Sequence, residues 1–378
     1  MRTLEDFPRS EWRDSTEKLR RIDANNAAKV TYKDIYWTVP LLLRLLDRVD
    51  ELLAAGDQVE ALGLAEPLPT LAGAIPLASE RHHIRYYVDS LEAVEALVFA
   101  HCSLCSAYRA NAKYPEARFQ AEKALEVAAR SSSRLAQAEA KRRAANLADD
   151  LGDFALAESL LADAIDIFTE LEDRERLSLA LICLGNTRNN SKGMGYGCVE
   201  YASAIYHAAS ARSERATRAI CFAATNLAMV AARLPITEAN EVFGAIKSAS
   251  IALRDRPLGV PRLLVRWAEA IVANRCALGR YAIKELEKVR GGLLKRGALP
   301  QALTCISDLL AIVEEQEDRE TLLRTASESA RAVRDAIRGS TPTDELKKVV
   351  QAWLKQPVDV ESLRKSLQLA SGRVSRQG

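Results

Sequence analysis

Small residues recur every forty positions through the middle of the chain, inside stretches whose apolar residues are three or four apart. They form two sets: Cys105, Ala145 and Gly185 in the first, and Ala117, Ala157 and Gly197 in the second. Small side chains let two helix axes approach closely where they cross. The pattern therefore predicts antiparallel helical hairpins stacked at a fixed period, as in an α-solenoid.

The clearest hairpin covers residues 138–171 and turns at the sequence LGDF, residues 151–154. Equivalent hairpins are predicted on both sides, most of them with a large apolar residue near the start of the second helix. They cover 98–131, 178–211, a weaker match at 220–253, a restored match at 264–296 and a looser pair at 300–337. In the 264–296 hairpin, LGRY at 278–281 is the predicted turn.

The segment before these hairpins predicts a helical cap. Residues 1–35 are polar and are expected to form a loosely held arm. A helix is predicted at 36–56, with Pro40 near its start and Gly56 as its C-cap. Its partner at 57–80 contains three prolines and is expected to break near 67–70.

Residues 36–338 thus hold the predicted solenoid, and its clearest internal break is RDRPLGVP at 254–261, where two prolines and a glycine end a helix. Residues 339–378 predict a linker, two short basic helices and a disordered tail.

Composition supports helices, because 48% of the 378 residues are hydrophobic but only 6% are aromatic. The net charge of +2 is too mild to predict nucleic-acid binding by itself. The seven cysteines are scattered through helical stretches, which suits a reducing cytosol. The charged N-terminus has no signal-peptide pattern, and no apolar run reaches the length of a membrane span. We expect a soluble, cytoplasmic protein.

The run Leu-Gly-x-aromatic, followed by two alanines seven residues apart, resembles the tetratricopeptide repeat. Residues 261–337 also look like part of a loosely described group of bacterial tetratricopeptide proteins, which carry a similar LGRY…L..VR..L..RG…AL…DL run. The resemblance implies an all-α, right-handed α-solenoid of antiparallel hairpins. It further implies a protein-binding scaffold or the sensor part of a regulator, and it implies no reaction.

In such arrays the first helix of each hairpin lines a concave groove. Counting from the small position, the groove is predicted to receive Ser106, Arg109, Arg142, Asn146, Asp149, Asn186, Asn189 and Asn226. Asparagine is a mediocre helix former, so an Asn every forty residues needs a reason. Two alternatives stay open: the amides bind the backbone of an extended peptide, or they bind each other or water between adjacent helices.

Arg142 and Asn146 also resemble one rung of the family's carboxylate-binding clamp. The rungs on either side, Cys102 with Ser106 and Ile182 with Asn186, depart from the clamp pattern. The departure argues against a chain-terminal acidic ligand.

Other candidate chemistry is weak. Cys102 and Cys105 form a Cys-x2-Cys pair, but zinc needs four ligands and no second pair is visible, so structural cysteines are predicted. None of the four histidines lies in a catalytic motif. The glycine cluster NNSKGMGYG at 189–197 lacks the phosphate-loop spacing and is predicted to be a hairpin turn rather than an anion-binding loop.

These patterns predict a non-enzymatic protein without metal or cofactor that binds a protein or peptide partner in its groove. The alternative is a peptide- or ligand-responsive regulator acting on a protein or nucleic-acid partner. Nucleic acid is the less favoured partner and would be contacted by the basic C-terminal helices through its phosphates. The sequence predicts no membrane contact and leaves the oligomeric state open.

Overall fold

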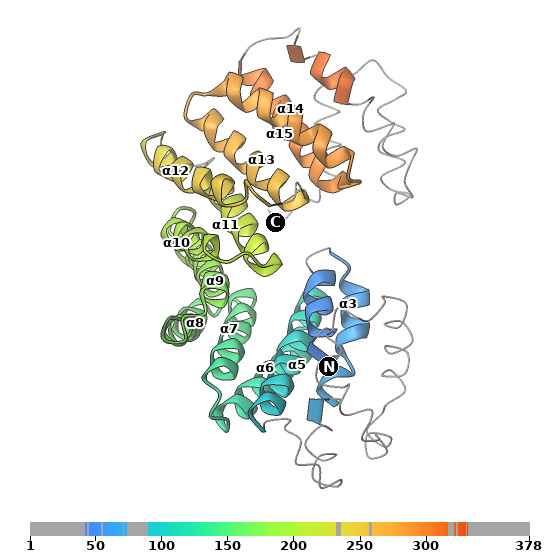
Figure 1. Ribbon diagram of the computed structural model, residues 1–378, viewed down its shortest axis with the longest axis vertical. Coiled ribbons are helices and arrows are strands. Elements are labelled where there is room, and N and C mark those ends of the chain that lie inside the picture. The colour runs from blue at the N-terminus through green and yellow to red at the C-terminus, as the bar shows by residue number, and fades with distance from the viewer. Residues whose placement is uncertain are drawn as a thin grey trace. The chain divides into compact units, whose positions relative to one another are not determined.

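The computed structural model describes residues 42–43, 45–53, 56–70, 72–73, 90–231, 236–256, 259–316, 321–322, 324–329 and 331 (Figure 1). Every regular element among these residues is an α-helix, and they contain no strand. The predicted all-α class is therefore confirmed. The predicted arm at 1–35 and the basic segment at 339–378 lie outside the described residues.

The chain forms two compact units, Met1–Ser191 (unit 1) and Lys192–Gly378 (unit 2). In unit 1, helical residues 45–53 are followed by α3 (Gln58–Ala65), α5 (Ser90–Ala110), α6 (Tyr114–Ala129), α7 (Arg134–Asp150), α8 (Phe154–Glu170) and α9 (Arg174–Lys192). α5 packs against α6 and α7, and α7 packs against α8 (Figure 1). The α5/α6 hairpin thus contacts the α7/α8 hairpin, as the forty-residue period requires.

Unit 2 repeats this arrangement. Its helices are α10 (Cys198–Ala209), α11 (Glu214–Ala231), α12 (Ile236–Ala252), α13 (Val260–Arg275), α14 (Gly279–Leu294) and α15 (Leu299–Glu315). α11 packs against α10, α12 and α13, and α13 packs against α14 and α15. We call the first helix of each hairpin, the odd-numbered α5 to α15, an A helix, and its even-numbered partner a B helix.

The small residues lie where the sequence predicts them. Cys105 packs with Ala117 at the crossing of α5 and α6, and both side chains are fully buried. Ala145 packs with Ala157 at the crossing of α7 and α8. Large side chains at these points would separate the helix axes, which explains the choice of residue.

Polar caps start the helices of the central hairpin. The Ser133 side chain accepts a hydrogen bond from the backbone N–H of Ala136 at the start of α7. The Asp153 side chain does the same for Leu156 at the start of α8. Such caps satisfy N–H groups that have no partner inside the helix, so they fix where each helix begins.

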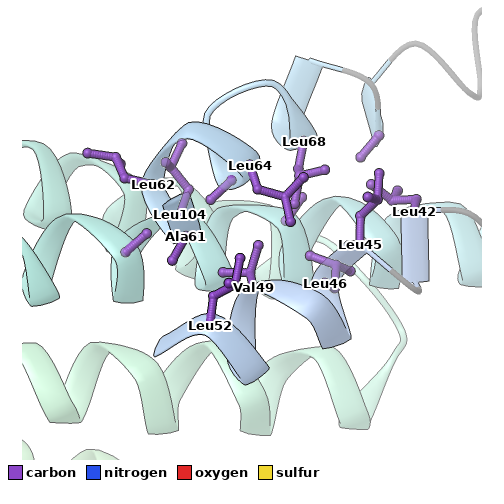
Figure 2. Packing of buried hydrophobic residues seen from close by; sticks show 14 of the residues in the cluster. Leu42, Leu45, Leu46, Val49, Leu52, Ala61, Leu62, Leu64, Leu68 and Leu104 are labelled. Carbon is purple, nitrogen blue, oxygen red and sulfur yellow. The ribbon is translucent and has the colours of Figure 1, made fainter. Parts of the chain in front are cut away.

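The predicted N-terminal cap is also present (Figure 2). One face of the first helix is buried against α3 and α5, and it consists of Leu42, Leu45, Leu46, Val49 and Leu52. The helix is followed by Gly56 at φ 84°, in the left-handed region that glycine tolerates. The partner helix is interrupted by a turn at residues 66–67 and resumes at 68, which confirms the proline break.

The glycine cluster shortens the third hairpin. Ala117 and Ala157 lie inside their B helices, but Gly197 is the residue that precedes α10. Gly193 and Gly195 have φ values of 107° and 110°, which keep the chain out of the helical region. The cluster is a turn, as predicted, and it delays the start of α10.

One predicted turn is wrong by two residues. LGRY at 278–281 was aligned with LGDF at 151–154, yet Gly279 is the first residue of α14. The left-handed residue of this turn is Ala277, at φ 62°, in the place that Gly152 holds between α7 and α8. Gly279 is buried, and a Cβ there would lie 2.7 Å from the side chain of Gln316.

The break at 254–261 lies between two helices that still pack against each other. α12 ends at Ala252 and α13 begins at Val260, yet α12 and α13 remain in contact. Arg256 donates from Nη2 to the backbone oxygen of Ala211 (2.5 Å) and from Nη1 to that of Ser213 (3.3 Å). This arginine ties the loop to the start of α11. The boundary between the two units falls at Ser191–Lys192 instead.

Among the described helices, none combines the length and the hydropathy needed to cross a bilayer.

Candidate binding surfaces

A buried ionic cluster lies on α7, at a position where the sequence predicts ligand contact. Glu139 and Arg142 are only 6% and 5% exposed. Arg142 donates to the Glu139 carboxylate from Nε (3.0 Å) and from Nη2 (2.5 Å), and Arg143 donates to it from Nε (2.9 Å). Buried charges destabilise a fold unless they are paired, and one carboxylate here pairs two guanidinium groups.

Two contacts in unit 1 join helices that are separated by one complete hairpin. Arg143 donates from Nη1 to Ser106 Oγ on α5 (2.9 Å) and from Nη2 to the Asp50 carboxylate in helical residues 45–53 (3.2 and 3.3 Å). The Arg176 guanidinium of α9 lies 5.8 Å from the ring centre of Phe99 on α5. Side chains of unit 1 therefore meet across the A helices and occupy part of the predicted groove.

The cluster is ionised at neutral pH. Burial favours the neutral form of Glu139, but Arg142 and Arg143 outweigh burial and hold the pKa of its carboxyl well below the usual range. Burial, and then the Glu139 charge, raise the pKa of the neighbouring Cys102 thiol. Cys102 is therefore a protonated, buried thiol rather than a nucleophile.

The predicted groove residues of α5 and α7 lie in different environments. Ser106 and Arg142 are buried, whereas Arg109, Asn146 and Asp149 are half-buried. Arg143 binds the Ser106 hydroxyl and Glu139 binds the Arg142 guanidinium, the cation of the clamp-like rung. Contact of Ser106 and Arg142 with a ligand stays a prediction.

Polar bonds link successive A helices. Arg109 of α5 donates to Asp150 of α7 (2.7 and 3.2 Å), and Asn190 of α9 donates to Asp149 of α7 (2.9 Å). Burial raises the pKa of the Asp149 carboxyl, although hydrogen bonds from Thr187 and Asn190 oppose this shift. Arg109 and Asp149 thus bind neighbouring A helices.

Unit 2 contains the same kind of link between α13 and α15. Trp267 Nε1 donates to Asp308 Oδ2 (2.9 Å), and Asn274 Nδ2 donates to Glu315 Oε2 (3.0 Å). All these bonds, in both units, join residues 41 positions apart. Side-chain hydrogen bonds therefore hold α5 to α7, α7 to α9 and α13 to α15.

The asparagines predicted to form a ladder occupy equivalent positions. α7, α9 and α11 begin at residues 134, 174 and 214, so Asn146, Asn186 and Asn226 share one register and the fourth repeat is not shifted. All three are half-buried, as is Asn189. Their contact with a peptide stays a prediction.

Unit 2 carries an apolar row where unit 1 carries the ionic cluster. On α11, Phe222 and Met229 hold the positions of Arg142 and Asp149, and Asn226 lies between them. Phe222 is 46% exposed and Met229 is 52% exposed. Neither residue is among the polar candidates predicted from the sequence, although the forty-residue period alone locates both.

The row continues on α13. The buried face of α14, consisting of Ala282, Leu286, Val289 and Leu293, repeats the spacing of Ala157, Leu161, Ala164 and Phe168 in α8. This alignment places Trp267 and Ile271 at the positions of Arg142 and Asn146. Trp267 is buried and Ile271 is half-buried. The A-helix face of unit 2 is thus mainly apolar at the positions equivalent to Arg142 and Asn146.

The remaining candidates from the sequence, His101 and the Cys-x2-Cys pair, lie in unit 1. His101 Nδ1 lies 2.7 Å from Gln120 Oε1, and burial lowers the pKa of its imidazole. Cys102 and Cys105 are both buried and unoxidised. Within the described ranges, no group of three or more His, Cys, Asp or Glu residues could hold a metal ion.

No protein-family model and no curated protein matches the chain. A tetratricopeptide repeat protein from Parabacteroides merdae is similar in structure, with 12% identity and a TM-score of 0.36 over 86% of this chain and 98% of that chain. A circular tandem repeat protein has 13% identity and a TM-score of 0.28, over 97% and 95%. The stacked hairpins and their small-residue crossings themselves define an all-α helical repeat protein.

Proposed function

We propose that this chain is a non-enzymatic scaffold that binds a protein or peptide partner along the A helices of unit 2. The observation that carries the proposal is the row on α11, where Phe222 and Met229 are exposed on either side of Asn226. Residues spaced four and then three apart share one helix face, so a single segment can contact all of them. Clustered exposed apolar side chains mark interaction sites in soluble proteins.

The row also indicates the kind of partner. Phe222 and Met229 suit apolar side chains, and methionine adapts to irregular shapes. The Asn226 amide can donate to a backbone carbonyl and accept from a backbone N–H. A segment that alternates apolar side chains with accessible backbone groups meets both requirements. On α7 of unit 1 the position of Phe222 is held by the buried Arg142 and that of Met229 by Asp149, which Asn190 binds, so we assign binding to unit 2.

The test is a peptide selection on the full chain. Peptides selected from a random display library are measured by fluorescence anisotropy against the wild type and against Phe222→Ala/Met229→Ala. Truncated hot-spot side chains cost more than about 1 kcal/mol each, so the pair should lose roughly thirtyfold or more in affinity. The matched control is Phe119→Ala/Met194→Ala, which removes the same two side-chain types from other exposed positions. The control should bind within about twofold of the wild type, as expected for residues outside an interface.

Equal losses in both double variants would place the binding site elsewhere. The selected peptides are also recovered after incubation and weighed by mass spectrometry. Unchanged peptides support a binding role, whereas cleaved or modified peptides contradict the non-enzymatic assignment.

A further inference from the structure

The B helix α14 carries a row of positive charge. Residues 279–297 contain six Lys or Arg and two Glu. Four of the cations are exposed at helical spacing along one face: Arg280, Lys284, Lys288 and Lys295. We call them the basic row. At 1.5 Å per residue the row is about 22 Å long, and its members one turn apart are separated by about 6 Å along the axis. The opposite face of α14 is buried, so the row points away from the unit's core.

The two glutamates do not cancel this charge. Glu285 accepts hydrogen bonds from Arg266 on α13 and from Lys288 (2.6 Å), and its side chain is only 13% exposed. It is therefore drawn toward α13 and away from solvent. Glu287 is half-buried beside the row. Glu285 shares its charge between Lys288 of the row and Arg266, and Glu287 flanks the row, so four cations against two carboxylates still leave a net positive strip, although the chain as a whole has a charge of only +2.

An ordered aromatic ring lies beside the basic row. Tyr281 is 41% exposed, and its hydroxyl donates to Glu269 Oε1 on α13 (2.8 Å). Ser250 Oγ of α12 donates to the other Glu269 oxygen (2.6 Å), which holds that carboxylate in place. The phenol oxygen is thus anchored while part of the ring remains open to solvent.

Within the basic row, Gly291 leaves space for a ligand to approach the helix backbone. Gly291 lies between Lys288 and Lys295 on the same face, and a Cβ added there would meet no atom within 4 Å. Packing therefore does not demand glycine at this position. Its effect is to leave the helix backbone bare between two cations, so an extended ligand can lie close against it.

We propose that the basic row of α14 binds the phosphates of a single-stranded nucleic acid, with Tyr281 as the stacking surface for a base. A nucleic-acid strand carries one negative charge per nucleotide, and a straight row of cations matches such a regular charge. Aromatic rings beside a basic strip are the usual means of holding single strands without reading their sequence. An acidic protein segment would match the charge but would gain nothing from the ordered ring. The proposal is independent of peptide binding on α11, and either can fail alone.

The test measures anisotropy of labelled 20-nucleotide oligothymidine and oligouridine with the full chain. Four phosphate contacts predict a slope of about −3 for log affinity against log salt, hence roughly a fiftyfold loss between 50 and 200 mM salt. Lys284→Gln/Lys288→Gln/Lys295→Gln should lose about tenfold or more at 50 mM and reduce the slope to about −1. The control neutralises three other exposed cations of unit 2, Arg212→Gln/Lys247→Gln/Arg254→Gln, and should change affinity less than about twofold because these cations lie outside the row.

Two substitutions at one position test the stacking role. Tyr281→Ala should weaken binding by about tenfold, whereas Tyr281→Phe retains the ring and should bind nearly as tightly as the wild type. Absence of binding at 50 mM salt, or an equal loss in the control, would overturn the proposal. If polyglutamate competes as well as the oligonucleotide and Tyr281→Ala has no effect, the row binds acidic protein segments instead.

Discussion

Arg143 binds Asp50 across 93 residues of sequence, with its Nη2 atom 3.2 Å from Asp50 Oδ2. The same guanidinium reaches Ser106 and Glu139, so a single side chain joins helical residues 45–53, α5 and α7. The A-helix surface of unit 1, which the sequence predicts to bind ligands, is thus partly covered by contacts between the protein's own side chains. The apolar row of unit 2 becomes the better candidate for partner binding.

The ionic cluster should be essential to the stability of unit 1. Glu139→Gln leaves Arg142 and Arg143 buried without their shared carboxylate, and we expect the free energy of unfolding to fall by about 3–5 kcal/mol. The measurement is urea unfolding followed by circular dichroism. Glu170→Gln is the control, because Glu170 pairs with Arg134 on the surface and should change stability by less than about 1 kcal/mol. Similar losses in both variants would contradict a special role for the cluster.

The same carboxylate should make unit 1 sensitive to acid. The folded pKa of Glu139 lies below its unfolded value, so its contribution is complete above the unfolded pKa of about 4.3 and is lost as pH falls toward the folded pKa. The wild type should therefore lose more stability between pH 5 and pH 3 than Glu139→Gln does. Urea midpoints at both pH values give the comparison. Parallel losses in the two proteins would show that other carboxylates dominate.

Two adjacent glycines of α14 should respond to alanine in opposite ways. Gly291 faces open space, so Gly291→Ala should stabilise the helix by about 0.5–1 kcal/mol. A Cβ at Gly292 would lie 2.8 Å from a methyl group of the buried Leu263, so Gly292→Ala should destabilise unit 2 by about 1–3 kcal/mol. Thermal melts of the two variants provide the test. A stabilised Gly292→Ala would mean that α13 and α14 pack less closely than described.

Cysteine reactivity should follow burial. Burial raises the pKa of the Cys105 thiol to about 11 and that of Cys221 to about 12, so almost no thiolate forms at pH 8. The buried set is Cys102, Cys105, Cys221 and Cys305, and the half-buried set is Cys183, Cys198 and Cys276. Iodoacetamide at pH 8 should modify only the half-buried set in the folded protein, and all seven in urea. Peptide mapping that finds modified Cys105 before unfolding would refute this assignment.

The hairpins could be predicted because their signals are local. Small residues at the crossings, apolar residues at helical spacing and the caps Ser133 and Asp153 all act within one or two helices. The turn before α14 was misplaced because Leu-Gly-x-aromatic occurs there by coincidence, while Ala277 adopts the left-handed conformation without being glycine. Sequence motifs locate a helix better than its exact ends.

The environment of the candidate site could not be predicted in the same way. Arg142 and Asn146 have the spacing of a ligand clamp, but the burial of Arg142 depends on Glu139, and Arg143 is bound by Asp50, 93 residues away. No period in the sequence encodes such a contact. The apolar row of α11 was predictable from the sequence, because continuing the forty-residue register from Arg142 leads directly to Phe222. A search limited to polar residues does not find it, because Phe222 and Met229 are apolar.

The contacts that skip a repeat bear on how unit 1 unfolds. In an array whose repeats touch only their neighbours, hairpins can detach from an end one at a time. Asp50–Arg143 and Phe99–Arg176 connect elements that are not neighbours. Detaching helical residues 45–53 therefore breaks a bond to α7 as well as exposing α5. Terminal fraying should be suppressed, and unit 1 should melt as one cooperative block rather than as a series of independent hairpins.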